Sequence, residues 1–271
     1  MTLIVSWAGV DSRSPSSLYI ASDSRITWGK KHFDQGKKVF ACKSHPDIFG
    51  YCGDVLFPLM ILNQIVDSID SGLLYSADWN YRKKTEKVRR RLMDSFNRYP
   101  HEVNTIMDDS VEIIHGIRDD LDSSFHCMQL KWTRKENKWR FNELPLKKYS
   151  YQVRVSGSGA KDFDDIYNEY KKKPDFKTSR AVFQTFCDTL KNTRRETVGG
   201  APQLVGLYRK KGSHAMMFGI INNGHRYFDG LQVDNYERDN LNKVEWRNDL
   251  FERCDGKRKK IISGAQRQPH I

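Results

Sequence analysis

Hydrophobic and polar residues follow two different periods along this chain, and the two periods separate predicted strands from predicted helices. Near the start, β-branched and other apolar residues are concentrated in residues 2–8 (TLIVSWA) and 18–25 (LYIASDSR), with an Asp-, Ser- and Pro-containing turn between them. Such runs predict an antiparallel pair of strands. Shorter runs of the same kind predict strands at residues 38–43 and 48–52.

A helical period follows these strands. Over residues 55–69 apolar side chains recur at three- and four-residue steps, which is the spacing of one helix face. The same spacing predicts a second helix over residues 83–97 with a basic opposite face, and Pro100 ends it. Two further helices are predicted at residues 161–170 and 179–192.

The remaining apolar runs predict strands between and after the two helix pairs. They lie at residues 111–118, 125–133, 138–143, 149–156, 202–209 and 214–221. The order is therefore strands, two helices, strands, two helices, strands. This order predicts an α+β protein, a four-layer αββα sandwich in which two antiparallel sheets lie between two layers of helices.

The chain is expected to form one domain. Its 271 residues permit one large domain or two small ones, and no internal repeat divides the sequence. The periodic pattern weakens from Gly224 onward. Residues 1–251 are therefore predicted to form a single domain, and residues 252–271 a basic, polar C-terminal tail without regular structure.

The chain is strongly basic, with a formal net charge of +12 and a pI near 9.4. Such a field attracts nucleic acid, acidic peptides or the acidic surface of a partner. Basic residues cluster at residues 82–91 and 257–260, where a solvated helix face and a charged tail are the ordinary interpretations. Nearby aromatic residues such as Trp79 and Trp139 raise the alternative of a nucleic-acid-binding module. No recognised motif of that class accompanies the charge, so this alternative ranks last.

Cysteine and histidine usage argues against several kinds of site. The five cysteines are scattered without a CxxC pair, which disfavours a disulfide framework and a zinc site. The eight histidines show no ligand spacing such as HxxxH, so neither a metal nor an organic cofactor is expected. The start has no basic segment leading into an apolar run, and no stretch approaches the roughly 18 apolar residues of a membrane span. We therefore expect a cytoplasmic protein without membrane attachment.

Thr2 is the first residue with candidate chemistry. Its small side chain makes Met1 a target for removal by a methionine aminopeptidase, which would leave a hydroxyl and a free amine on one residue. An α-amine titrates near pH 8, so at neutral pH a useful fraction accepts the hydroxyl proton. By itself, however, a threonine at position 2 is more often an ordinary strand residue.

Three other segments add polar groups to the same region. Asp23 leaves the strand predicted to pair with the one that starts at Thr2, and a carboxylate there can hold an ammonium. Lys38 starts the next strand, where an ammonium would stabilise developing negative charge. Ser158 lies in a Gly-Ser-Gly turn before a helix, and such a turn can approach a reacting centre closely. Taken alone, each segment is more often an ordinary surface turn or a solvated strand end.

Together, these segments resemble proteasome β-type subunits and their bacterial or archaeal relatives. In that family a threonine opens the mature chain, Asp-Ser-Arg ends the second strand, and a lysine before a valine starts the next. A Gly-containing strand end then leads into the first helix, and Gly-Ser-Gly begins the third. The matching segments here are Thr2 and residues 23–25, 38–39, 49–54 and 157–159. The resemblance spans about residues 2–221.

The resemblance implies the fold and activity of an N-terminal-nucleophile hydrolase. Thr2 would be the nucleophile with its own amine as proton acceptor, and Lys38 would tune the site electrostatically. Asp23 would orient Lys38 and the amine, and Ser158 would position both. The backbone amide of Gly53 would donate to the oxyanion. The substrate would be a peptide bond of a peptide or protein, attacked to give an acyl-enzyme ester that water hydrolyses.

One segment departs from the family pattern of an aspartate, two residues, a serine and two glycines. Here Arg195 and Val198 occupy the aspartate and serine positions. A positive Arg195 beside the amine would disfavour the protonated amine, and Glu196 or Thr197 would have to substitute by a small shift. The departure leaves two hypotheses open, an active threonine peptidase and a catalytically inactive scaffold or binding subunit.

The resemblance also implies assembly. Subunits of the proteasome type form rings, so we expect a homo-oligomeric ring or stacked assembly. An ATPase or another acidic partner is compatible with the basic charge of the chain.

Overall fold

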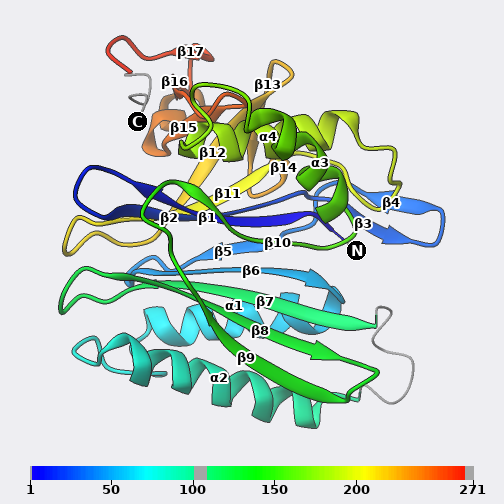
Figure 1. Cartoon of the computed structure of the whole chain (residues 1–271), viewed down its shortest axis with the longest axis vertical. Coiled ribbons are helices and arrows are strands. Elements are labelled where there is room, and N and C mark those ends of the chain that lie inside the picture. The colour runs from blue at the N-terminus through cyan, green and yellow to red at the C-terminus, as the bar shows by residue number, and fades with distance from the viewer. Residues whose placement is uncertain (1, 101–108, 266–271) are drawn as a thin grey trace.

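A computed structural model describes residues 2–100 and 109–265 of the chain. Within these residues it contains seventeen strands in three sheets, four α-helices and one 3-10 helix (Figure 1). In the same part of the chain, none of the helices is both long enough and apolar enough to cross a membrane.

The largest sheet has ten strands, and the N-terminal strand is second from one edge. Its main path runs β10-β1-β2-β11-β12-β15-β16-β17, and β13 and β14 branch from β12. The strands are β1 (Ile4–Val10), β2 (Pro15–Ser22), β10 (Tyr151–Ser156), β11 (Gln203–Tyr208), β12 (Met216–Asn222), β13 (His225–Phe228), β14 (Leu231–Gln232), β15 (Trp246–Asn248), β16 (Arg253–Asp255) and β17 (Lys260–Ile261). The 3-10 helix Arg238–Lys243 lies between β14 and β15.

The second large sheet has five antiparallel strands in the order β5-β6-β7-β8-β9. They are β5 (Val39–Ala41), β6 (Asp47–Gly53), β7 (Ser110–Arg118), β8 (Phe125–Thr133) and β9 (Lys138–Leu144). β3 (Ile26–Trp28) and β4 (Lys31–Phe33) form a separate hairpin, which projects from the protein at the level between the two large sheets (Figure 1). This hairpin was not predicted, because strands of three residues carry too few positions for a period.

The α-helices lie in two pairs. The helices α1 (Leu56–Asp70) and α2 (Tyr81–Arg98) lie against the five-stranded sheet, and α3 (Ala160–Tyr170) and α4 (Ser179–Asn192) lie against the ten-stranded sheet (Figure 1). Two of them start with a side-chain cap, since Asn80 accepts from the amide of Lys83 and Thr178 from that of Ala181. These caps fix where α2 and α4 begin.

Apolar side chains fill three layers of core. One core lies between the two large sheets and includes Ile4, Ile20, Ile48 and Val205. A second lies under α3 and α4, and a third under α1 and α2. Both faces of the central strands are therefore buried, which explains why β1 and β6 appear in the sequence as nearly continuous apolar runs.

The predicted fold class is wrong. We expected a four-layer αββα sandwich of two antiparallel sheets, whereas the described residues form mostly sheet, with seventeen strands in three sheets and few helices. The largest sheet is also mixed, because β12 and β15 pair in parallel. The error arises after Gly224, where β13 to β17 are two to four residues long and leave no periodic signal.

The predicted C-terminal tail is also wrong over part of its length. Two strands, β16 and β17, lie within residues 252–265, and Cys254 of β16 is buried. Tertiary packing against Trp246 supplies the order that the polar sequence does not indicate. Residues 266–271 lie outside the described residues, and the division into one domain and a tail stays a prediction.

Candidate functional site

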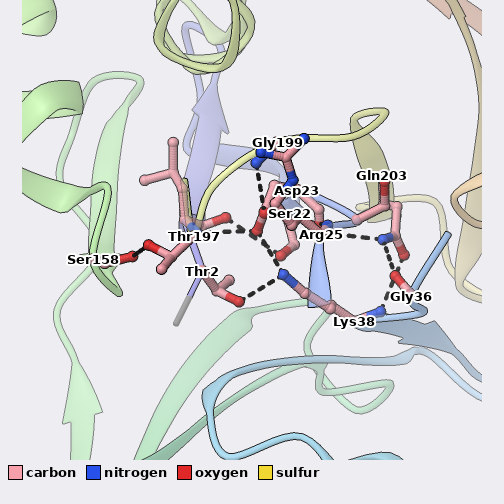
Figure 2. Close-up of polar contacts among 12 residues, drawn as sticks. Thr2, Ser22, Asp23, Arg25, Gly36, Lys38, Ser158, Thr197, Gly199 and Gln203 are labelled. Carbon is pink, nitrogen blue, oxygen red and sulfur yellow. Dashed lines mark hydrogen bonds and ion pairs between the residues drawn. The ribbon is translucent and has the colours of Figure 1, made fainter. Parts of the chain in front are cut away.

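Thr2, Asp23 and Lys38 meet in the interior of the protein (Figure 2). The antiparallel register of β1 and β2 pairs Ile4 with Ser22, which brings the residues just before β1 next to Asp23. Lys38 arrives from the other sheet, immediately before β5. Its ammonium Nζ donates to Thr2 Oγ1 at 2.7 Å and to Asp23 Oδ1 at 2.9 Å.

The carboxylate of Asp23 is surrounded by donors. Besides the Lys38 ammonium, Oδ1 accepts from the amide of Leu3 at 3.1 Å, and Oδ2 accepts from the amides of Gly199 at 3.1 Å and Arg25 at 3.4 Å. Asp23 is fully buried. A buried carboxylate is tolerable only with such partners, so this side chain is fixed in one orientation.

Two opposing effects act on the pKa of Lys38. Burial lowers the pKa of Lys38 below its ordinary value, although the neighbouring Asp23 carboxylate partly restores it. An ammonium has donors only, so the Thr2 hydroxyl must accept from it. The hydroxyl proton of Thr2 is then free to be transferred to a base.

Gln203 is a site residue that the sequence did not reveal. Its amide Nε2 donates to the carbonyl oxygens of Asp23 at 3.2 Å and Gly36 at 2.7 Å, and its Oε1 accepts from the backbone amide of Lys38 at 3.1 Å. It is 1% exposed. The side chain therefore ties together the two segments that carry Asp23 and Lys38, but a single glutamine at a strand start gives no sequence signal.

Ser158 lies near Thr2 but pairs with a different hydroxyl. Its Oγ is 2.9 Å from Oγ1 of Thr197, and within the described part of the chain it shows no hydrogen bond to Thr2 or Lys38. The loop itself contacts the nucleophile candidate, because the amide of Gly159 donates to the carbonyl of Thr2 at 3.3 Å. Of the two residues that the sequence offered as substitutes in this segment, Glu196 and Thr197, it is Thr197 that contacts Ser158.

Two glycines shape the surroundings of Thr2. Gly157 has φ +93°, and a Cβ at this position would lie 2.0 Å from the carbonyl oxygen of Thr2. Gly53 has φ +95°, and its Cβ would lie 2.0 Å from the carbonyl oxygen of Ser110. Only glycine fits both the backbone angle and the space at these positions.

A pocket of about 320 Å³ lies beside this site. Gly53, Gly157 and Ser158 form part of its lining, and charged residues of β7 and β8 form another part. Gly157 packs against the carbonyl oxygen of Thr2, so the pocket lies next to Thr2. Gly53 and Ser158 line the same pocket.

Glu112 forms the buried charged part of this pocket. Its carboxylate accepts from Gln129 at 2.8 Å, from Arg154 at 2.8 and 3.2 Å, and from Ser156 at 2.6 Å, and Lys131 Nζ lies 3.6 Å away. Burial raises the pKa of Glu112, but the hydrogen bonds from Arg154 and Ser156 outweigh it and hold the pKa below its usual value. The carboxylate therefore stays ionised.

The two departures from the family pattern have separate structural outcomes. Arg195 forms an ion pair with Asp162 at 3.0 Å, with 40% of its side chain exposed. Val198 is buried in the core under α3 and α4. The Arg195 guanidinium is therefore paired with a carboxylate of α3, and the backbone amide of Gly199 contacts Asp23.

The five cysteines are free and buried. In residues 2–100 and 109–265, no group of three or more His, Cys, Asp or Glu side chains is arranged to hold a metal ion.

Known proteins resemble this chain in structure rather than in sequence. No family model and no curated protein matches the chain. Anbu (ancestral beta-subunit) from Yersinia bercovieri is similar with a TM-score of 0.54 and 12% identity, covering 79% of this chain and 86% of that one. The chain has a proteasome-like fold. The helical assembly of the Anbu complex from Pseudomonas aeruginosa gives a TM-score of 0.57 and 14% identity, covering 83% of this chain and 86% of that one.

These comparisons correct the family resemblance inferred from the motifs. The similar structures are Anbu proteins, which are proteasome-like but distinct from the proteasome β-type subunits. The segments around Thr2, Asp23 and Lys38 do not discriminate between such related groups, because a few short motifs leave most of the sequence unconstrained. At 12–14% identity the likeness shows the proteasome-like fold alone.

Proposed function

We propose that this chain is an N-terminal threonine amidohydrolase that cleaves peptide bonds. The contact that supports this proposal most directly is the buried ammonium of Lys38, which lies 2.7 Å from Thr2 Oγ1 and 2.9 Å from Asp23 Oδ1. A lysine this deeply buried destabilises a fold unless it is paired, and here its second partner is a hydroxyl. An ordinary ion pair would not need that hydroxyl.

The proposed reaction begins when residue 1 is removed. The free α-amine of Thr2 accepts the hydroxyl proton, and Oγ1 attacks the carbonyl carbon of the substrate amide. The resulting oxyanion accepts a hydrogen bond from the amide of Gly53, and the ammonium of Lys38 stabilises the developing charge. The C–N bond breaks, the leaving amine takes the proton, and water hydrolyses the ester on Thr2.

Three other residues position these groups in the proposal. Asp23 orients the ammonium of Lys38 through the bond at 2.9 Å. Ser158, paired with Thr197, would place the α-amine of Thr2. Ser158 and Thr197 are therefore positioning residues.

A substrate must be able to reach the hydroxyl of Thr2. Thr2 is only 1% exposed in the chain that still carries residue 1. Cleavage between residues 1 and 2 must therefore both create the free amine and make the hydroxyl reachable by a substrate.

The experiment that tests the proposal is intact mass spectrometry with two electrophiles. A peptide epoxyketone reacts with the hydroxyl and the free amine together, whereas a β-lactone needs only the hydroxyl. We expect loss of the Met1 mass, a single adduct with each reagent mapping to Thr2, no adduct in Thr2→Ala, and a retained adduct in Thr2→Ser. An undiminished adduct or undiminished peptidase activity in Thr2→Ala would overturn the assignment.

A second candidate function is a non-catalytic scaffold or binding subunit. The burial of Thr2 and the replacement of a family serine by the buried Val198 support it. Retained Met1 together with no adduct from either reagent would favour this candidate and remove the catalytic roles of Thr2 and Lys38.

We further propose that the protein is a cytoplasmic homo-oligomer, as a single domain with a short basic C-terminal segment. The support is the similar Anbu structure from Pseudomonas aeruginosa, which is a helical assembly, and the five free cysteines of this chain. Light scattering should show a mass several times that of one chain, whereas a monomer at high concentration would contradict the proposal. A feeding ATPase or another acidic partner is part of the same proposal, and co-purification tests it.

A further inference from the structure

A serine, a histidine and a carboxylate also meet far from Thr2. Ser124 Oγ lies 2.9 Å from His126 Nε2, and His126 Nδ1 lies 2.7 Å from Glu143 Oε1. Ser124 immediately precedes β8, His126 is the second residue of β8, and Glu143 lies on the neighbouring β9.

This cluster is separate from the threonine site. Along β7, Val111 pairs with Gly53 beside the Thr2 pocket, whereas Arg118 pairs with Phe125, next to Ser124. Strand residues rise by about 3.4 Å each, so these two ends of β7 are about 24 Å apart.

In one tautomer of His126, the hydrogen bonds of the cluster run from serine to imidazole to carboxylate. An ionised Glu143 only accepts, so His126 must carry its proton on Nδ1 and donate it to Oε1. Nε2 of the neutral imidazole is then unprotonated, and it accepts from the Ser124 hydroxyl in the rotamer in which that hydroxyl does not donate to Asp122. This is the arrangement in which an imidazole acts as base toward a serine nucleophile.

The imidazole is held in place on several sides. Its ring stacks on that of Tyr81 with 3.3 Å between centroids and 6° between planes, and its side chain is only 15% exposed. The turn that carries the serine is also fixed, because the amide of Ser124 donates to Asp122 Oδ1 at 2.8 Å. The relative positions of serine and imidazole are therefore set before any ligand binds.

The cluster borders a pocket of about 620 Å³, which is the size of a small-molecule site. Apolar side chains of Phe125, Leu144 and Leu146 form much of its wall. Arg209 also lines it, and its guanidinium is held by Asp11 and Ser14. The pocket therefore combines room for an apolar acyl chain with one fixed cation.

We propose that Ser124, His126 and Glu143 form a second nucleophilic site, which hydrolyses carboxylic esters with apolar acyl chains. Ser124 Oγ forms a bond to the carbonyl carbon as its proton passes to His126 Nε2. The ester C–O bond then breaks, and the imidazolium gives that proton to the departing alcohol. Water attacks the acyl-serine by the same relay, which releases the carboxylic acid and restores Ser124.

Asp122 is the competing partner for the serine hydroxyl. Hydrogen bonds from the Ser124 hydroxyl and its backbone amide lower the pKa of the Asp122 carboxyl. A Ser124 that only completes this turn would not be nucleophilic, so covalent labelling of its hydroxyl separates the two roles.

The test uses an alkyl fluorophosphonate probe and p-nitrophenyl butyrate on the full chain carrying Thr2→Ala, so that any reaction at Thr2 is removed. We expect one probe adduct, mapping to Ser124, and ester hydrolysis that Ser124→Ala abolishes. The change His126→Ala should lower hydrolysis by about 100-fold or more. Glu143→Gln, a change in a positioning residue, should lower it by about tenfold and shift its pH profile.

Ser71→Ala is the matched control, because Ser71 is an exposed serine just after α1 and does not line this pocket. This variant should keep the adduct and the hydrolysis within twofold. Thermal unfolding checks that each variant is folded. Labelling of Ser124→Ala equal to that of its parent, or no adduct on the folded parent under conditions that label an ordinary serine esterase, would overturn the proposal.

Discussion

Lys38 reaches Thr2 from the opposite sheet. Thr2 precedes β1 of the ten-stranded sheet and Lys38 precedes β5 of the five-stranded sheet, yet Nζ and Oγ1 are 2.7 Å apart in the protein interior. The ion pair of Lys38 with Asp23 joins the same two sheets. The candidate site therefore depends on how the sheets pack, and substitutions there should report on stability as well as on chemistry.

The first prediction concerns this buried pair. Replacing Lys38 by Met leaves the Asp23 carboxylate buried without its cation, which should lower the free energy of unfolding by about 3–5 kcal/mol. The double variant Asp23→Asn/Lys38→Met removes both charges and should recover part of that loss. Urea unfolding of the two single variants and the double variant measures the coupling. Strict additivity would show that the two side chains do not interact energetically.

The second prediction concerns the close approach of Gly157 to Thr2. A Cβ at Gly157 would lie 2.0 Å from the carbonyl oxygen of Thr2, so Gly157→Ala should lower the free energy of unfolding by at least about 3 kcal/mol. Gly212 is the matched control, because it also has a positive φ but a Cβ there would meet nothing within 4 Å. Gly212→Ala should cost only about 1 kcal/mol. If thermal or urea unfolding gave the same loss of stability for both variants, the positive φ alone, and not the close contact with Thr2, would account for the loss at Gly157.

The third prediction separates Thr197 from Arg195. If Thr197 substitutes for the family serine, Thr197→Val removes the 2.9 Å contact with Ser158 and should slow formation of the Thr2 adduct by about tenfold or more. Arg195 binds Asp162 on the surface, so Arg195→Ala should leave that rate within twofold. The measurement is adduct formation against time by intact mass. If Arg195→Ala slowed adduct formation more than Thr197→Val, Arg195 rather than Thr197 would be the residue that acts at the site.

The fourth prediction concerns the pH dependence of stability at Glu112. Burial raises the pKa of Glu112, but the hydrogen bonds from Arg154 and Ser156 lower it by more than burial raises it. The folded pKa therefore lies below the unfolded value. The stabilisation is therefore complete above the unfolded pKa, near 4.3, and is lost as the pH falls through the folded pKa. At pH 7, Glu112→Gln should cost about 3 kcal/mol, and its difference from the wild type should shrink below about pH 4.

Glu86 provides the control for that experiment. Hydrogen bonds from Arg89 lower the pKa of Glu86 to about 2, but this pair lies on the exposed surface of α2. Solvent screens such pairs, so Glu86→Gln should change the free energy of unfolding by less than about 1 kcal/mol. Urea unfolding at several pH values measures both variants. A pH-independent cost for Glu112→Gln would show that the lost contacts are not ionic.

The sequence by itself determined the local parts of this protein. Apolar residues at helical spacing placed α1 to α4, and alternating or continuous apolar runs placed the main strands up to β12. Both signals depend only on neighbouring residues, so they are visible without the fold. The order of these elements also placed Asp23 and Lys38 at strand ends, and the structure brings both to Thr2.

The tertiary structure decided the rest, for two physical reasons. Strands of two to four residues, such as those after Gly224, are ordered by their partners rather than by their own pattern, which is why the predicted fold class and the tail were wrong. Contacts between residues that are far apart in the sequence also leave no signal in the sequence around either residue. Gln203 binds the backbone of Lys38 across 165 residues of sequence, and Gly199 binds Asp23 across 176. Such partners become visible only when packing brings the segments together.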